Sequence, residues 1–179
     1  MIQNCEFFVG TGINPDYEAI KRFLTVRPYP VDAPGVETSL HKTVGDIALV
    51  LYAVLWEDLK CAGTKVPKEM EEVWGVTTLF EDAFQGIDPR VVEMDEFLFN
   101  PTGYTGVPLD NWEGDGSFCL TTAKRLNGAV AIFKPGVAER IERAIGSFWA
   151  VFTSVHEAMI HPMTEVDADI LQVIMDSCL

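Results

Sequence analysis

The residues that come closest to a catalytic motif in this chain are His156, Glu157 and His161. A zinc protease places H-E-x-x-H on a helix, because a spacing of i, i+4 brings both imidazoles to one face. Here the spacing is i, i+5, so the histidines point to opposite faces of a strand and lie about 140° apart on a helix. The spacing therefore argues against a metal site and favours two polar residues near a strand end.

A second candidate is Asn111-x-Glu113-x-Asp115-Gly116, which has the alternating oxygen ligands and the glycine of a calcium loop. The bidentate acid of such a loop is expected at its twelfth position, where this chain has Thr122, and no helix is expected before it. A glycine-rich turn with solvated acids is the ordinary interpretation. We therefore predict no catalytic residue, no metal and no cofactor from these motifs.

Aromatic residues accompany the acids in the segment 100–117, which is rich in glycine and predicts a long loop between two halves of the chain. Tyr104 and Trp112 lie within this loop, and Phe118 follows it. Exposed aromatics among acidic residues suit a protein-binding loop, because Trp and Tyr dominate interface hot spots. The alternative is that Trp112 folds back over the core as a lid, and the sequence leaves both interpretations open.

The charge of the chain is unevenly distributed. Residues 57–115 carry 14 acids and 4 bases, whereas the other 120 residues carry 13 acids and 9 bases. An acidic surface of this kind either meets a basic protein partner or is a solvated face that keeps the protein soluble. The residues that we expect to contact a basic partner are Glu69, Glu71, Glu72, Tyr104, Asp110, Trp112, Glu113 and Asp115.

Composition excludes several classes of function. Strong acidity without a stripe of Lys and Arg disfavours direct nucleic-acid binding. The longest apolar run, residues 47–56, is half of what a membrane span needs, and no signal peptide is recognisable. Four scattered cysteines without an export signal predict reduced thiols and a cytoplasmic location. Cys5 and Cys119 are expected to be buried and inert.

The elements that must position these residues are clearest after residue 120. Residues 128–133 are an apolar run after Asn127 and predict a buried strand. Pro135-Gly136 then opens a helix whose apolar face repeats at i, i+4 and i+8 and which ends at Gly146. Alternation predicts a strand at 148–152, and a tight reversal leads to another at 155–161.

Earlier segments alternate between strand and helix signals. Residues 20–27 predict a strand that stops at Pro28, whereas the apolar run 47–55 suits a buried strand or a helix. A short helix is expected over 67–74 and ends at Gly75. The sequence from Thr78 to Glu81 is a capping box that opens a second helix ending near Gly86.

Several short motifs follow one another in a fixed order: Asp46-Ile-Ala-Leu-Val-Leu-Tyr, Trp74-Gly75-Val76, Glu81-Asp82-Ala83, Asn127-Gly-Ala, Pro135-Gly136 and Ser154-Val-His-Glu157. This order resembles a domain family of unknown function from anaerobic gut bacteria and their mobile elements. The resemblance covers roughly residues 40–162. It implies that residues 47–55 form a strand that pairs with 62–66. It implies no catalytic residue.

Taken together, these patterns predict a single α+β domain over residues 1–179, with an antiparallel or mixed sheet and helices mainly on one face. Two functions are compatible with them. The first is a non-enzymatic interaction module that binds a basic protein, for example an inhibitor of a nucleic-acid-binding or defence protein. The second is a small ligand-binding domain or hydrolase centred on His156 and Glu157 with Asp110 or Asp115. The oligomeric state does not follow from the pattern.

Overall fold

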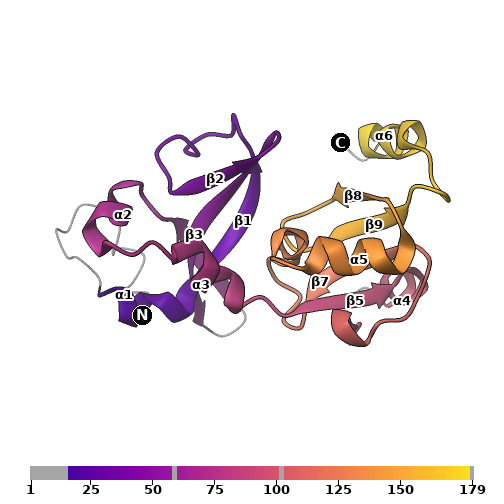
Figure 1. Ribbon diagram of the computed structural model, residues 1–179, viewed down its shortest axis with the longest axis horizontal. Coiled ribbons are helices and arrows are strands. Elements are labelled where there is room, and N and C mark those ends of the chain that lie inside the picture. Colours follow the sequence, from indigo (N-terminus) through magenta and orange to yellow (C-terminus); the bar gives the residue numbers. More distant parts are fainter. Residues whose placement is uncertain (1–15, 58–59, 101–102, 178–179) are drawn as a thin grey trace. The chain divides into compact units, whose positions relative to one another are not determined.

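The computed structural model describes residues 16–57, 60–100 and 103–177, which divide into two compact units. Unit 1 ends at Gly86 and unit 2 begins at Ile87, and each has its own sheet (Figure 1). Every described strand pairing is antiparallel. The predicted α+β class with antiparallel sheets is therefore confirmed, whereas the single domain stays a prediction.

Unit 1 is a four-stranded sheet with short helices. Its elements are α1 (Tyr17–Ile20), the 3₁₀ helix η2 (Lys21–Phe23), β1 (Leu24–Pro30), β2 (His41–Val44), β3 (Ile47–Glu57), β4 (Lys60–Lys65), α2 (Glu69–Trp74) and α3 (Leu79–Gln85). The strand β3 pairs with β1, β2 and β4. The run 47–55 is thus a strand, and it pairs with the following strand as the family resemblance implied.

The first strand differs from its prediction at both ends. Residues 17–23 are helical, and β1 continues through Pro28 and Pro30 where we expected it to stop. A proline cannot donate to a strand ladder, but among the described strands β1 lies at the edge of the sheet and pairs only with β3. On the side of β1 that faces away from β3, no described strand needs an N–H donor from Pro28 or Pro30.

The two predicted helices of unit 1 are present. Gly75 ends α2 in the left-handed conformation at φ 61°. Thr78 precedes α3 as expected, yet its side chain makes no capping bond to the backbone. Its hydroxyl instead donates to Asp82 Oδ2 at 3.0 Å, so the predicted capping box is wrong.

Unit 2 holds a five-stranded sheet in the order β6-β5-β7-β9-β8. Its elements are β5 (Pro89–Glu93), α4 (Met94–Phe99), β6 (Val107–Pro108), η3 (Leu109–Asn111), β7 (Phe118–Thr122), η4 (Gly128–Phe133), α5 (Val137–Ile145), β8 (Phe148–Phe152), β9 (Ala158–Pro162) and α6 (Ala168–Ser177). The predicted loop 100–117 thus contains a short strand and a 3₁₀ turn in its described part.

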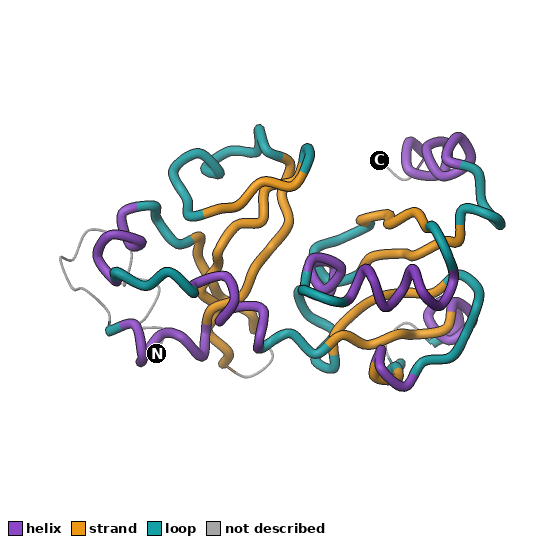
Figure 2. Tube along the Cα trace, viewed as in Figure 1, coloured by secondary structure: helices purple, strands orange, loops and turns teal. Residues whose placement is uncertain are grey.

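Helices cover both faces of this sheet. Val92, Cys119 and Met159 align across three strands and face the cluster that includes Phe97 of α4. On the other face, η4 packs against β7 and α5 follows it (Figure 2). The ring of Phe133 in η4 stacks on that of Phe152 in β8, with ring centroids 5.8 Å apart. All five residues of β7 are buried, because this strand is covered from both sides.

Residues 128–133 form the 3₁₀ helix η4, so the predicted strand is wrong. Asn127 adopts a left-handed conformation at φ 54° and turns the chain before the helix. Gly128 then lies so close to β7 that a Cβ atom there would stand 2.5 Å from Thr121 Cα. In an apolar run this short, hydrophobic periodicity does not distinguish a buried helix from a buried strand.

None of the helices in the described residues combines the length and the apolarity needed to cross a bilayer. Three of the four cysteines fall outside the described side chains. Residues 1–15, with Cys5, and residues 178–179, with Cys178, lie outside the described part, as does the side chain of Cys61.

Candidate functional site

The acids predicted to meet a partner in unit 1 lie on α2. Glu69, Glu71 and Glu72 are all exposed, and they border a shallow hollow of about 370 Å³ together with Lys68. Their position in the first turn is favourable, because the amino end of a helix carries partial positive charge. Within the described chain no ion pair joins any of the three.

The predicted acids of unit 2 are Asp110, Glu113 and Asp115, and all three are exposed. Asp110 belongs to η3, and the other two follow it before β7 begins. None of them forms an ion pair with another described residue. The negative charges of these three carboxylates are therefore not neutralised by any described Lys or Arg side chain.

The aromatic residues of the loop are buried, which corrects their expected exposure. Trp112 is 3% exposed and packs on Phe118 with ring centroids 4.3 Å apart. Its Nε1 donates to Glu93 Oε1 at 2.8 Å, and its carbonyl accepts a bond from Arg140 Nη2 at 2.6 Å. The structure therefore supports the second of the two interpretations, in which Trp112 folds back on the core. A buried ring of this kind anchors the loop and presents no surface to a partner.

Tyr104 is likewise only 3% exposed. Its ring packs against Phe97, Arg125 lies over the ring at 5.5 Å, and its hydroxyl donates to Glu157 Oε1 at 3.1 Å. Burial, followed by the nearby Glu157 carboxylate, raises the pKa of Tyr104 to about 12. The residue therefore stays neutral at any physiological pH and serves as a hydrogen-bond donor to Glu157.

His156 and Glu157 precede β9 and lie in the turn after β8, so the predicted strand begins at Ala158 and not at 155. The Ser154 hydroxyl accepts bonds from the N–H groups of both residues, which fixes the turn. His156 Nδ1 accepts the N–H of Asn127, and the His156 carbonyl accepts the N–H of Gly128. These bonds hold the turn against the start of η4.

Glu157 is equally engaged in local structure. Besides Tyr104, it accepts the Ser154 hydroxyl at 2.5 Å. No described contact brings Asp110 or Asp115 to His156 or Glu157. The side chains of the second hypothesis are therefore not assembled into one constellation by any described interaction.

His161 lies on β9, away from the turn that holds His156, and its Nδ1 is 2.9 Å from Ser117 Oγ. Burial lowers its pKa below the ordinary value, so the ring is neutral near neutral pH. In the part of the chain that the structure describes, no three His, Cys, Asp or Glu side chains are grouped as a metal would require.

Cys119 has no exposed surface and lies on β7 between two strands. Burial, followed by the charge of Glu157, raises the pKa of its thiol to about 12. The burial of Cys119 is confirmed, and the raised pKa leaves little of the reactive thiolate near neutral pH.

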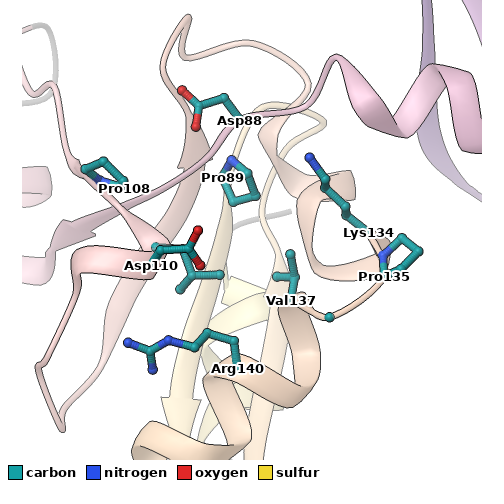
Figure 3. Close-up of a pocket in the computed structure, with 10 residues that line it drawn as sticks. Asp88, Pro89, Pro108, Asp110, Lys134, Pro135, Val137 and Arg140 are labelled. Carbon is teal, nitrogen blue, oxygen red and sulfur yellow. The ribbon is translucent and has the colours of Figure 1, made fainter.

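Sequence reasoning missed a hollow of about 260 Å³ where α5 begins. Figure 3 shows Asp88 and Lys134 toward one end, Arg140 at the other, and Asp110 with Val137 between them. Both cations are engaged with the backbone: Lys134 Nζ donates to the Ile87 carbonyl at 2.5 Å, and Arg140 donates to Trp112. The two bases therefore fasten adjacent loops, and the hollow contains both signs of charge.

Sequence reasoning also missed α4. Leu98 is 61% exposed and Phe99 is 85% exposed on this short helix, beside the exposed acids Asp95 and Glu96. The available signal was the run Phe97-Leu98-Phe99, because three consecutive apolar residues on a helix cannot all face one core.

Comparison with known proteins identifies a family. Residues 30–177 match the family described as "Family of unknown function (DUF5688)". This range is wider than the resemblance read from the motifs and includes residues of both units. No curated protein and no solved structure matches the chain.

Proposed function

The chain belongs to the DUF5688 family of unknown function, and we propose that it is a non-enzymatic module that binds a basic protein through exposed acids on each of its two units. The observation that carries the proposal is the state of the six predicted acids. All are exposed, and none is paired with a described cation. They are Glu69, Glu71, Glu72, Asp110, Glu113 and Asp115.

Such acids are suited to a charged partner. Carboxylates that are already solvated and unpaired raise the association rate of a basic protein without first breaking an internal salt bridge. By contrast, the acids Asp82 and Asp88 are paired with Lys21 and Arg90, at 3.1 Å and 2.9 Å. The chain thus keeps a subset of its acids free while others are used in the fold.

One concrete form of this proposal is an inhibitor of a nucleic-acid-binding or defence protein. The basic surface of such a protein is built for phosphates, and the free carboxylates of either unit compete for the same cations. An origin in gut bacteria or their mobile elements and a cytoplasmic location belong to this form of the proposal. The aromatic residues Tyr104 and Trp112 do not, because both are buried.

The test is affinity capture from a bacterial lysate with increasing salt in the wash, read by mass spectrometry. The wild-type chain is compared with a variant in which the six acids are replaced by Gln or Asn. We expect a stoichiometric basic partner that is released progressively by salt and is lost from the variant.

The matched control neutralises six other exposed acids, three in each unit: Asp32, Glu37, Asp46, Glu139, Glu142 and Glu165. It changes the net charge equally and should keep the partner. Equal loss in both variants would show that only total charge matters. Retention of the partner by the first variant would contradict the proposal.

A further inference from the structure

The helix α4 presents an apolar surface that the fold does not use. Phe97 packs inward, with its ring 5.6 Å from that of Tyr104 and against the cluster of Val92, Tyr104 and Cys119. Leu98 and Phe99 follow it and cannot share this direction, because successive helical residues are rotated by about 100°. Phe99, at 85%, is the most exposed large apolar side chain among the described residues.

Acidic side chains accompany this apolar pair. Asp95 is three residues before Leu98 and four before Phe99, so the three share one side of the helix. Glu96 is also exposed and is next to Asp95. No described cation pairs with either carboxylate. The helix therefore combines an apolar pair with free negative charge on a surface that turns away from the core.

The charge decides which occupant this surface fits. In a symmetric dimer the patch would meet itself and oppose Asp95 and Glu96 with the same acids. A chain with a formal net charge of −14 is likewise repelled by anionic lipid headgroups. A basic polypeptide that carries an apolar side chain satisfies both the acids and the apolar pair.

We propose that α4 is the anchor of the interaction surface and binds a basic segment with a central apolar side chain. Leu98 and Phe99 contact that apolar side chain, and Asp95 and Glu96 pair with Lys or Arg on either side of it. This inference rests on the proposed function, because it assigns the apolar centre of the same basic partner. Hot spots have this composition, with an aromatic anchor at the centre and charges at the rim.

The test uses a random twelve-residue peptide library displayed on phage and selected on the full chain. We expect enriched sequences with Lys or Arg on both sides of Leu, Phe or Trp. The most enriched sequence, made as a synthetic peptide, should bind the Phe99→Ser variant at least about tenfold more weakly, which is the loss typical of a hot spot. The Asp95→Asn/Glu96→Gln variant should weaken binding and reduce its dependence on salt.

The matched control is Val173→Ser, which removes a side chain that is 68% exposed on α6. It should leave the affinity unchanged, and because Phe99 and Val173 are both exposed, dispersed amide spectra should show that both variants fold. Absence of basic apolar sequences, or equal binding by wild type and Phe99→Ser, overturns the anchor. Should Phe99→Ser still capture the salt-sensitive lysate partner at full strength, the anchor also fails while the proposed function stands.

Discussion

Several titratable side chains of this protein have their protonation state set by burial or by a hydrogen-bond partner within the chain. Among the described residues, every buried side-chain nitrogen or oxygen atom has a hydrogen-bond partner. Tyr17, Tyr104 and Cys119 are held in their neutral forms, and Asp82 is held as a carboxylate. Each of these states contributes to stability over a defined range of pH.

The Tyr17–Asp82 bond gives the first prediction. The Tyr17 hydroxyl donates to Asp82 Oδ2 at 2.6 Å and is the largest cause of a pKa of Asp82 below its ordinary 3.8. A lowered pKa contributes stability above that value, which is lost as pH falls through the folded pKa. We expect Tyr17→Phe to lower the free energy of unfolding near neutral pH, because the variant loses the hydrogen bond to the Asp82 carboxylate. The difference should shrink below pH 3.8 in urea unfolding.

Tyr29→Phe is the control, because the Tyr29 hydroxyl has no hydrogen bond among the described residues, while its ring lies under Lys65 at 4.6 Å. Its stability should match the wild type at every pH. A Tyr17→Phe variant that is as stable as Tyr29→Phe would show that the Asp82 bond contributes nothing.

Cys119 gives the second prediction. In a chain whose other three cysteines are replaced by Ser, we expect the native protein to resist a thiol reagent and to react fully once unfolded in urea. The thiol has no exposed surface and a pKa raised from 9.0 to about 12. Because that pKa is raised, the stabilising effect of the neutral thiol is full below pH 9.0 and is lost as pH rises toward the folded value. Fast reaction of the thiol reagent with the folded chain near neutral pH would contradict a buried, neutral Cys119 thiol.

At the level of elements, periodicity predicted the strands and helices that bury one clear face. The helix α5 was predicted because its apolar residues repeat every fourth position, and Val137 and Ile141 are buried as that repeat requires. The run 47–55 could not be assigned from periodicity, because every position is apolar. It became a strand through its pairing with three neighbours, which only the fold supplies.

The errors arise where a contact distant in sequence decides the local structure. Residues 128–133 became a 3₁₀ helix because Gly128 lies against β7 and the His156 carbonyl. Tyr104 was expected to be exposed and the position of Trp112 was left open, because their partners Glu157 and Glu93 come from other elements. The exposure of Leu98 and Phe99 on α4 was not predicted for the same reason. Phe97 packs against a cluster that includes Cys119 of β7, and this contact leaves the next two residues of the helix exposed.

The third prediction concerns Gly128, which joins β7, η4 and the His156 turn. A Cβ atom there would stand 2.4 Å from the His156 carbonyl oxygen and 2.5 Å from Thr121 Cα, and both are backbone atoms. Gly128→Ala must therefore displace one of these segments, and we expect a loss of about 2 kcal/mol or more of unfolding free energy. Thermal unfolding checks this. Gly116→Ala is the control, because a Cβ at Gly116 has open space, and it should be close to neutral.

At the level of the whole molecule, the range of the family match and the boundary between the two compact units do not coincide. The family match runs over residues 30–177 and therefore crosses the boundary between the two units at Gly86. The buried residues, in contrast, form clusters within one unit, such as Val36 with Ala48 and Val50, or Val92 with Tyr104 and Cys119. A unit with its own sheet and its own buried cluster meets the physical requirement for folding alone.

The last prediction follows from this division. Residues 87–179 contain the complete five-stranded sheet and both of its covered faces, with fully buried Phe118, Leu120 and Ile160. The cut would fall beside Gly86, an exposed residue at the end of α3. We expect this fragment to unfold cooperatively in urea and to give a dispersed amide spectrum, with Trp112 shielded from fluorescence quenchers. A collapsed spectrum would instead support one domain over residues 1–179, whose two sheets fold only together.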